Sequence, residues 1–83
     1  MTDIDDDELD AEAAEKDAQL RRENPTEYAR QVVGGPSALA RAIGGISPQA
    51  VGQWQRVPAE RVIEVERVTG VSRHELRPDI YPD

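Results

Sequence analysis

The sequence predicts an all-α fold of four to five short helices. Apolar residues recur at the three- and four-residue spacing of helix faces, and no segment alternates between apolar and polar residues as a strand does. Residues that favour helix starts, and glycines that favour helix ends, also divide the chain at short intervals. With 83 residues, the chain has room for one compact domain at most.

Acidic residues are concentrated at the N-terminus. The formal net charge is −7 at pH 7, yet residues 1–27 hold eleven Asp or Glu against three Lys or Arg, whereas the rest of the chain holds six against seven. We therefore expect an acidic arm, residues 1–23, followed by a folded domain, residues 24–83. Residues 2–10 are too acidic and too poor in large apolar groups to fold, so we expect disorder there. Residues 11–23 are rich in strong helix formers and are expected to form a fraying or docked helix.

The first helix of the domain is expected to begin in the segment "NPTE". Asn24 can accept a hydrogen bond from the first turn, and Pro25 suits the first helical position. Glu27 stands three residues after the cap, as a capping box requires. The pair Gly34–Gly35 ends the helix. Its apolar face is expected to consist of Tyr28, Val32 and Val33.

Three further helical segments are expected at residues 36–43, 58–69 and 72–76. The first and second begin at a proline and end at glycine, and the third has the Ser72-to-Glu75 spacing of a capping box. Residues 77–83 contain two prolines and are expected to be irregular. The core positions expected in these segments are Leu39, Ala40, Ile43, Val62, Val65, Thr69 and Leu76.

The segment "ISPQAVGQWQR", residues 46–56, predicts a short helix with two contrasting faces. Ser47 is a good N-cap, and Ile46 and Val51 have the spacing of a hydrophobic staple around it. At about 100° per residue, Val51 and Trp54 fall on one face, which we expect to be core, with Ala50 beside them. The opposite face consists of Gln49, Gly52, Gln53 and Arg56.

That polar face suits the edges of DNA bases. A Gln amide can pair bidentately with adenine, and Arg can pair with guanine or a phosphate. A glycine lets the backbone approach the groove wall closely. The preceding helix ends only a few residues earlier, which gives the helix, tight turn and helix of DNA-reading proteins. The residues expected at base edges or nearby phosphates are Ser47, Gln49, Gly52, Gln53 and Arg56, and those expected on the DNA backbone are Ser37, Arg41 and Arg61. The polar face alone is equally compatible with an ordinary solvated surface.

Residues 34–82 resemble a known group of proteins. The segments "SPQAV", "QW", "VPAER" and "LRPDIYP" carry a resemblance to the YdaS-like, Cro/Xre-type helix-turn-helix proteins of phages and prophages. The resemblance implies that the helix beginning at Ser47 and Pro48 is the recognition helix. It also implies that the helix beginning at Pro36 lies across the DNA backbone, with Ala40 as the small residue where the two helices cross. The acidic arm lies outside the resemblance.

The expected function is a sequence-specific DNA-binding transcriptional regulator of the Cro/repressor kind. One such unit covers little DNA, so we expect two copies to bind a palindromic operator. The two copies could form a homodimer. A flexible acidic arm would then compete with DNA phosphates as an electrostatic brake. The alternative is a protein-interaction module, antitoxin-like or a polymerase-binding adaptor, whose acidic arm binds a basic protein partner.

Other classes of function find little support in the residues. The chain has no cysteine and one histidine, so we expect no disulfide, no metal site and no cofactor. No nucleophile elbow or phosphate-binding loop is present, so an enzyme is not expected. No apolar run approaches the ~20 residues of a membrane span, and we expect a cytoplasmic protein without membrane contact.

Overall fold

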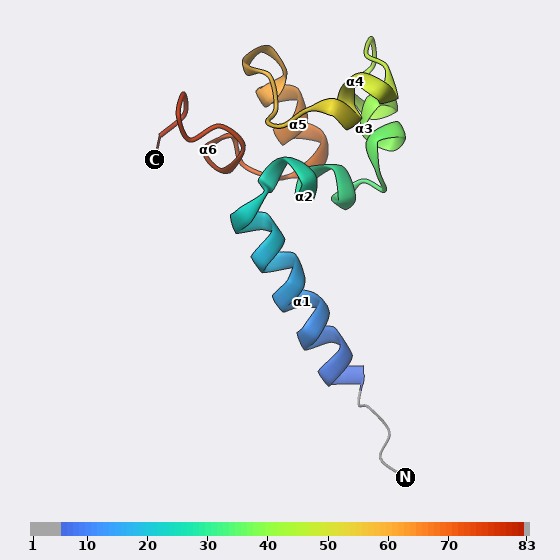
Figure 1. The fold of residues 1–83 in the computed structure, drawn as a ribbon, viewed down its shortest axis with the longest axis vertical. Coiled ribbons are helices and arrows are strands. Elements are labelled where there is room, and N and C mark those ends of the chain that lie inside the picture. Colours follow the sequence, from blue (N-terminus) through green and yellow to red (C-terminus); the bar gives the residue numbers. More distant parts are fainter. Residues whose placement is uncertain (1–5, 83) are drawn as a thin grey trace.

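The computed structural model describes the backbone of residues 6–82 and the side chains of residues 15–82 (Figure 1). This part of the chain contains helices and turns and no strand, which confirms the all-α prediction. In chain order the elements are α1 (Asp6–Glu23), α2 (Pro25–Val32), α3 (Pro36–Ile43), α4 (Pro48–Gln53), the 3₁₀ turn η1 (Ala59–Arg61), α5 (Val62–Thr69) and α6 (Arg73–Leu76).

Helix α1 is longer than the sequence suggested. The predicted disorder is wrong for residues 6–10, which belong to this 18-residue helix, whereas residues 1–5 lie outside the described part of the chain. The acids at its start and Arg21 and Arg22 in its last turn match the positive and negative ends of the helix dipole. Figure 1 shows α1 leading away from α3 and α4. Residues 6–23 of the arm therefore form a projecting helix. These described residues do not lie over α4 as a flexible brake would.

Arg21 joins the end of α1 to the domain. Its Nε and Nη2 donate to the two carboxylate oxygens of Glu75 at 2.5 and 2.9 Å. The guanidinium also lies over the ring of Tyr28, 5.4 Å from the centroid. Glu75 is already oriented by its capping box with Ser72. Hydrogen bonds from Arg21, followed by those of Ser72, lower the pKa of Glu75 to about 2.

Removing this contact should weaken the protein more at neutral pH than in strong acid, where the pair with Glu75 is lost and the contact with Tyr28 remains. The folded-state pKa of Glu75 lies below its ordinary 4.5, so its stabilisation is present above pH 4.5 and is lost as the pH falls through about 2. Because both side chains are a third or more exposed, we expect Arg21→Ala to lower the unfolding free energy by only about 1 kcal/mol at pH 7. Urea unfolding across pH 2–7 measures this difference, with exposed Arg22→Ala as the control. A difference of the same size at pH 2 and at pH 7 would contradict the assignment.

Helix α2 buries a different face from the one predicted. Asn24 caps it, with Oδ1 accepting from the amide of Glu27 at 3.1 Å, but the Glu27 carboxylate turns to Arg30 and Gln31 instead of closing the capping box. Val32 is exposed, and Tyr28 and Val33 are half-buried. The buried residues are Thr26, Ala29 and Arg30. The apolar face of α2 was predicted wrongly because hydrophobic spacing does not anticipate a buried charged residue, here Arg30.

The core consists of two neighbouring clusters of small and medium-sized side chains. Leu39, Ala40 and Val51 form the cluster between α3 and α4. The larger cluster consists of Ala29, Val57, Val62, Val65, Val71 and Leu76. The half-buried side chains of Ile43 and Trp54 pack against both clusters. The predicted core positions Leu39, Ala40, Val51, Val62, Val65 and Leu76 are confirmed.

The C-terminal half follows the predicted boundaries closely. The segment after Pro58 begins as η1 and continues as α5, which ends at Gly70 in the left-handed conformation at φ 78°. The capping box of Ser72 and Glu75 forms in both directions at the start of α6. Residues 77–82 are irregular, as expected, and are tied down by Arg77, which donates to Val57 O at 3.0 Å and pairs with Asp79 at 2.7 Å.

Candidate nucleic-acid interface

Helices α3 and α4 are joined by a four-residue turn, residues 44–47. Gly44 and Gly45 have φ of 80° and 69°, a region that favours glycine and that reverses the chain over this short distance. The buried faces of the two helices meet through Leu39, Ala40 and Val51, so Ala40 does lie where the helices pack. This contact fixes which side of α4 faces the core.

The start of α4 has the predicted capping geometry. The Ser47 hydroxyl accepts from the amide of Ala50 at 3.1 Å, and Pro48 occupies the first position of the helix. Ile46 packs against the cluster that contains Val51, as the staple requires. The N-terminal half of α4 is therefore held by local interactions that its own sequence encodes.

The polar face of α4 is exposed. Val51 is fully buried, whereas Ser47, Gln49, Gly52 and Gln53 are exposed. Within the described part of the chain, neither glutamine side chain makes a hydrogen bond to the protein. Two amides therefore stand on one surface with donors and acceptors available to a ligand.

Arg56 does not belong to this face. The helix was expected to continue to Arg56, but it ends at Gln53, and Trp54 adopts an extended conformation with ψ of 123°. Arg56 follows in the loop toward η1, where its Nη1 lies 3.4 Å from Asp79. The prediction of a helical stripe that includes Arg56 is wrong, because a tertiary contact ends the helix one turn early.

That tertiary contact is made by Arg30 of α2, which sequence reasoning missed. Its Nη1 donates to the carbonyl oxygens of Val51 and Trp54 at 2.9 and 3.0 Å, at the C-terminal end of α4. The last carbonyls of a helix lack partners within the helix, so a buried guanidinium satisfies them. The i,i+3 spacing of Glu27 and Arg30 was visible in the sequence, but nothing in it indicated that Arg30 would be buried.

The expected DNA-backbone residues are distributed unevenly. Ser37 and Arg41 are exposed on α3 and line an open groove with Gly45 and Pro48, beside the N-terminal end of α4. Arg41 makes no ion pair within the described residues. Arg61, by contrast, is half-buried and pairs with Glu64 at 3.0 Å. The structure thus brings Ser37 and Arg41 to α4 and leaves Arg61 engaged elsewhere.

Carboxylates are absent from the α3–α4 segment. No Asp or Glu occurs between Glu27 and Glu60, although the chain contains 17 acids. The charged residues in that interval are Arg30, Arg41 and Arg56, and Arg30 is buried. The surface of α3 and α4 is therefore free of the like-charge repulsion that the rest of the chain would present to a polyanion.

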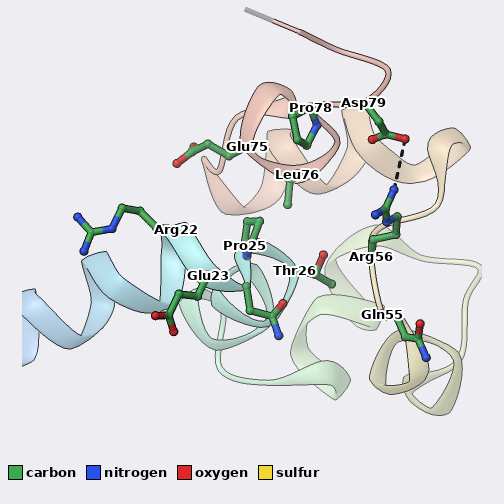
Figure 2. A pocket seen from close by; sticks show the side chains of 11 residues that line it. Arg22, Glu23, Pro25, Thr26, Gln55, Arg56, Glu75, Leu76, Pro78 and Asp79 are labelled. Carbon is green, nitrogen blue, oxygen red and sulfur yellow. Dashed lines mark hydrogen bonds and ion pairs between the residues drawn. The ribbon is translucent and has the colours of Figure 1, made fainter.

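A second open groove, separate from the one beside the start of α4, is lined by Arg56 (Figure 2). Residues around the junction of α1 and α2 form one wall and the C-terminal tail forms the other. Figure 2 shows Arg56 pointing across it to Asp79, and Arg22 at its far edge. Asp79 is held mainly by Arg77, whose hydrogen bonds lower its pKa to about 2. The groove mixes both signs of charge and does not continue the polar face of α4.

Two other kinds of site are absent from the described residues. No helix there has the length and apolarity needed to cross a membrane. The same residues contain no group of three or more His, Cys, Asp or Glu side chains placed to hold a metal ion.

Comparison with known proteins supplies a family. No curated protein and no solved structure matches the chain. The family described as bacterial toxin YdaS matches residues 26–83, which begin within α2 and include the α3–α4 unit and the C-terminal tail. The match starts eight residues before the resemblance noticed in the sequence and leaves α1 outside. It indicates a small protein of the phage-regulator or toxin–antitoxin kind. The chain belongs to the YdaS family.

Proposed function

We propose that this protein is a sequence-specific DNA-binding transcriptional regulator whose α4 reads the major groove. The observation that carries the proposal is the face of α4 opposite the fully buried Val51. Gln49 and Gln53 are both exposed there and free of protein hydrogen bonds within the described residues. An α-helix fits the major groove, and each glutamine can pair with the N6 and N7 of an adenine.

The surroundings of α4 support contacts to the DNA backbone. Ser37 and Arg41 flank the start of α4 and offer a hydroxyl and an unpaired guanidinium to phosphates. Amides in the first turn of α3 add to this, because the N-terminal end of a helix favours anions. Few free cations lie on this surface, so nonspecific affinity should be low, and two copies on a palindrome would supply the remaining affinity.

A second candidate function follows from α1. The family is described as a toxin, and the acidic α1 projects away from α3 and α4, where a protein could bind it without covering α4 (Figure 1). The second candidate is therefore a protein-interaction module that binds a basic partner. It differs from the proposed function in needing no base preference.

Selection of bound sequences from random double-stranded DNA tests the proposal. The full-length protein is used, and the same selection with the Gln49→Ala, Gln53→Ala double variant is the control. We expect the wild-type protein to enrich a palindromic site with half-sites about one helical turn apart. Enrichment of no sequence by the wild-type protein would refute the proposed function and favour the second candidate.

Gly52 allows the fold and the DNA contact to be tested separately. A Cβ built at this position would lie 3.8 Å from Pro36 Cβ and Cγ, which is ordinary contact, so alanine fits. Because alanine favours a helix by about 1 kcal/mol over glycine, Gly52→Ala should raise the unfolding free energy. We expect its affinity for the selected operator to fall several-fold, because the added methyl group stands on the face that approaches the groove. Unfolding and fluorescence-anisotropy titrations measure both; unchanged affinity would place Gly52 away from the DNA.

A further inference from the structure

We infer that Arg30 is the positioning residue that sets the orientation of α4 and thereby the base preference of Gln49 and Gln53. The inference rests on the proposed function. It concerns a residue of α2 that touches neither the exposed face of α4 nor a bound base. Its side chain is 10% exposed, so it acts from within the protein.

Arg30 is the only polar side chain that ties α4 to the rest of the described chain. Ser47 bonds within the α4 cap, and the two exposed glutamines make no hydrogen bond to any residue that the structure describes. The link from Arg30 Nη1 to Val51 O and Trp54 O spans α2 and the C-terminal end of α4. A helix of six residues has little hydrogen bonding of its own, so this end depends on the external donor.

Two points of attachment are needed to fix the direction of a short helix. Ile46 and Val51 anchor its beginning and middle in the α3–α4 cluster. Without Arg30, α4 keeps that anchor and can tilt about it, and its carbonyls would turn toward water. Reading a base requires donors and acceptors to be placed within about 0.5 Å, so a small tilt reduces discrimination more than it reduces contact with phosphates.

Glu27 holds Arg30 in the required orientation. Its Oε2 accepts from Arg30 Nε at 2.8 Å and lies 2.6 Å from Nη2, while Gln31 donates to its Oε1 at 3.3 Å. The hydrogen bond from Arg30, followed by that from Gln31, lowers the pKa of Glu27. One edge of the planar guanidinium therefore meets Glu27 and another meets α4. Lysine carries one compact ammonium group and cannot serve both edges in this geometry.

The test compares two Arg→Lys variants that alter an Arg–Glu pair. Arg30→Lys changes the contact with α4, whereas Arg73→Lys changes the pair of Arg73 with Glu66, which lies 2.9 Å away and does not touch α4. Each full-length variant is titrated with the selected operator and with random DNA, at a temperature where circular dichroism shows it to be folded. Partial unfolding lowers both affinities by the same factor, so the ratio of the two reports only base preference.

We expect the ratio of operator to random-DNA affinity to fall at least about fivefold in Arg30→Lys. That is the lower end of the discrimination contributed by one bidentate base contact. In Arg73→Lys the ratio should stay within about twofold of wild type. Hydrogen exchange at α4 should accelerate in Arg30→Lys alone. If wild type prefers the operator strongly and Arg30→Lys has the same ratio of operator to random-DNA affinity, this inference is overturned and the proposed function stays intact. A wild-type ratio near one overturns the proposed function and this inference with it.

Discussion

Replacing Trp54 with alanine is expected to lower the unfolding free energy by about 3 kcal/mol. The indole packs against both core clusters, so its loss leaves a cavity between them that the surrounding valines and leucines cannot fill. The ring is half-buried, which keeps the estimate at the lower end of the range for a large aromatic residue. A loss of this size is a large share of the few kcal/mol that stabilise a domain of this length.

Urea unfolding followed by circular dichroism measures this loss, because the variant lacks the only tryptophan of the chain. The matched control is Gln55→Ala, since the neighbouring Gln55 is exposed and should be replaceable at almost no cost. A Trp54→Ala protein as stable as wild type, but unable to bind DNA, would show that the ring faces the DNA instead of the core.

The Gln49→Ala, Gln53→Ala double variant is expected to lose most of its preference for the operator. Each bidentate glutamine–adenine pair contributes about 1–3 kcal/mol of discrimination, so the pair accounts for about 2–6 kcal/mol if the two positions act independently. Both side chains are exposed and make no hydrogen bond within the described residues, so the unfolding free energy should stay close to that of wild type.

Affinities of the single and double variants for operators changed at one base pair at a time assign each glutamine to its position. Gln55→Ala again serves as the control, since it removes an identical amide just outside α4. Operator discrimination that survives in the double variant would rule out direct reading by these two residues.

Local signals in the sequence were sufficient to predict most of the fold. The caps at Asn24, Ser47 and Ser72 form as expected, and α5 ends at Gly70. These features depend on residues within one turn of each helix end, so reading the sequence in short windows captures them. The buried positions Val51, Val62 and Val65 follow from helical spacing in the same way.

The end of α4 could not be predicted from its own residues. Nothing between Val51 and Arg56 forbids another helical turn. The helix ends where Arg30, more than twenty residues earlier, donates hydrogen bonds to the carbonyl oxygens of Val51 and Trp54. Burying a guanidinium runs against hydrophobic spacing, so the same residue also explains why the apolar face of α2 was predicted wrongly. The exposure of Gln49 and Gln53 was therefore predicted correctly, whereas the helical position of Arg56 was predicted wrongly.

The division into an arm and a domain stays a prediction. A truncation that begins at Asn24 would remove Arg21 and its contacts with Glu75 and Tyr28, yet the two core clusters contain none of the α1 residues whose side chains the structure describes, 15–23. The family match likewise begins after α1. We expect the truncated domain to fold, with the modest loss of stability already assigned to Arg21.

The proposal that α4 reads DNA is tested most directly by amide chemical-shift mapping of the full-length protein with its selected operator. If α4 reads the DNA, we expect the perturbed amides to lie on the exposed face of α4, at Gln49, Gly52 and Gln53, and at Ser37 and Arg41 beside it. Amides of α1, which projects away from α4, should keep their shifts (Figure 1). Perturbations that gather on α1 or along the groove of Figure 2, while α4 stays unchanged, would contradict the proposal that α4 binds the DNA.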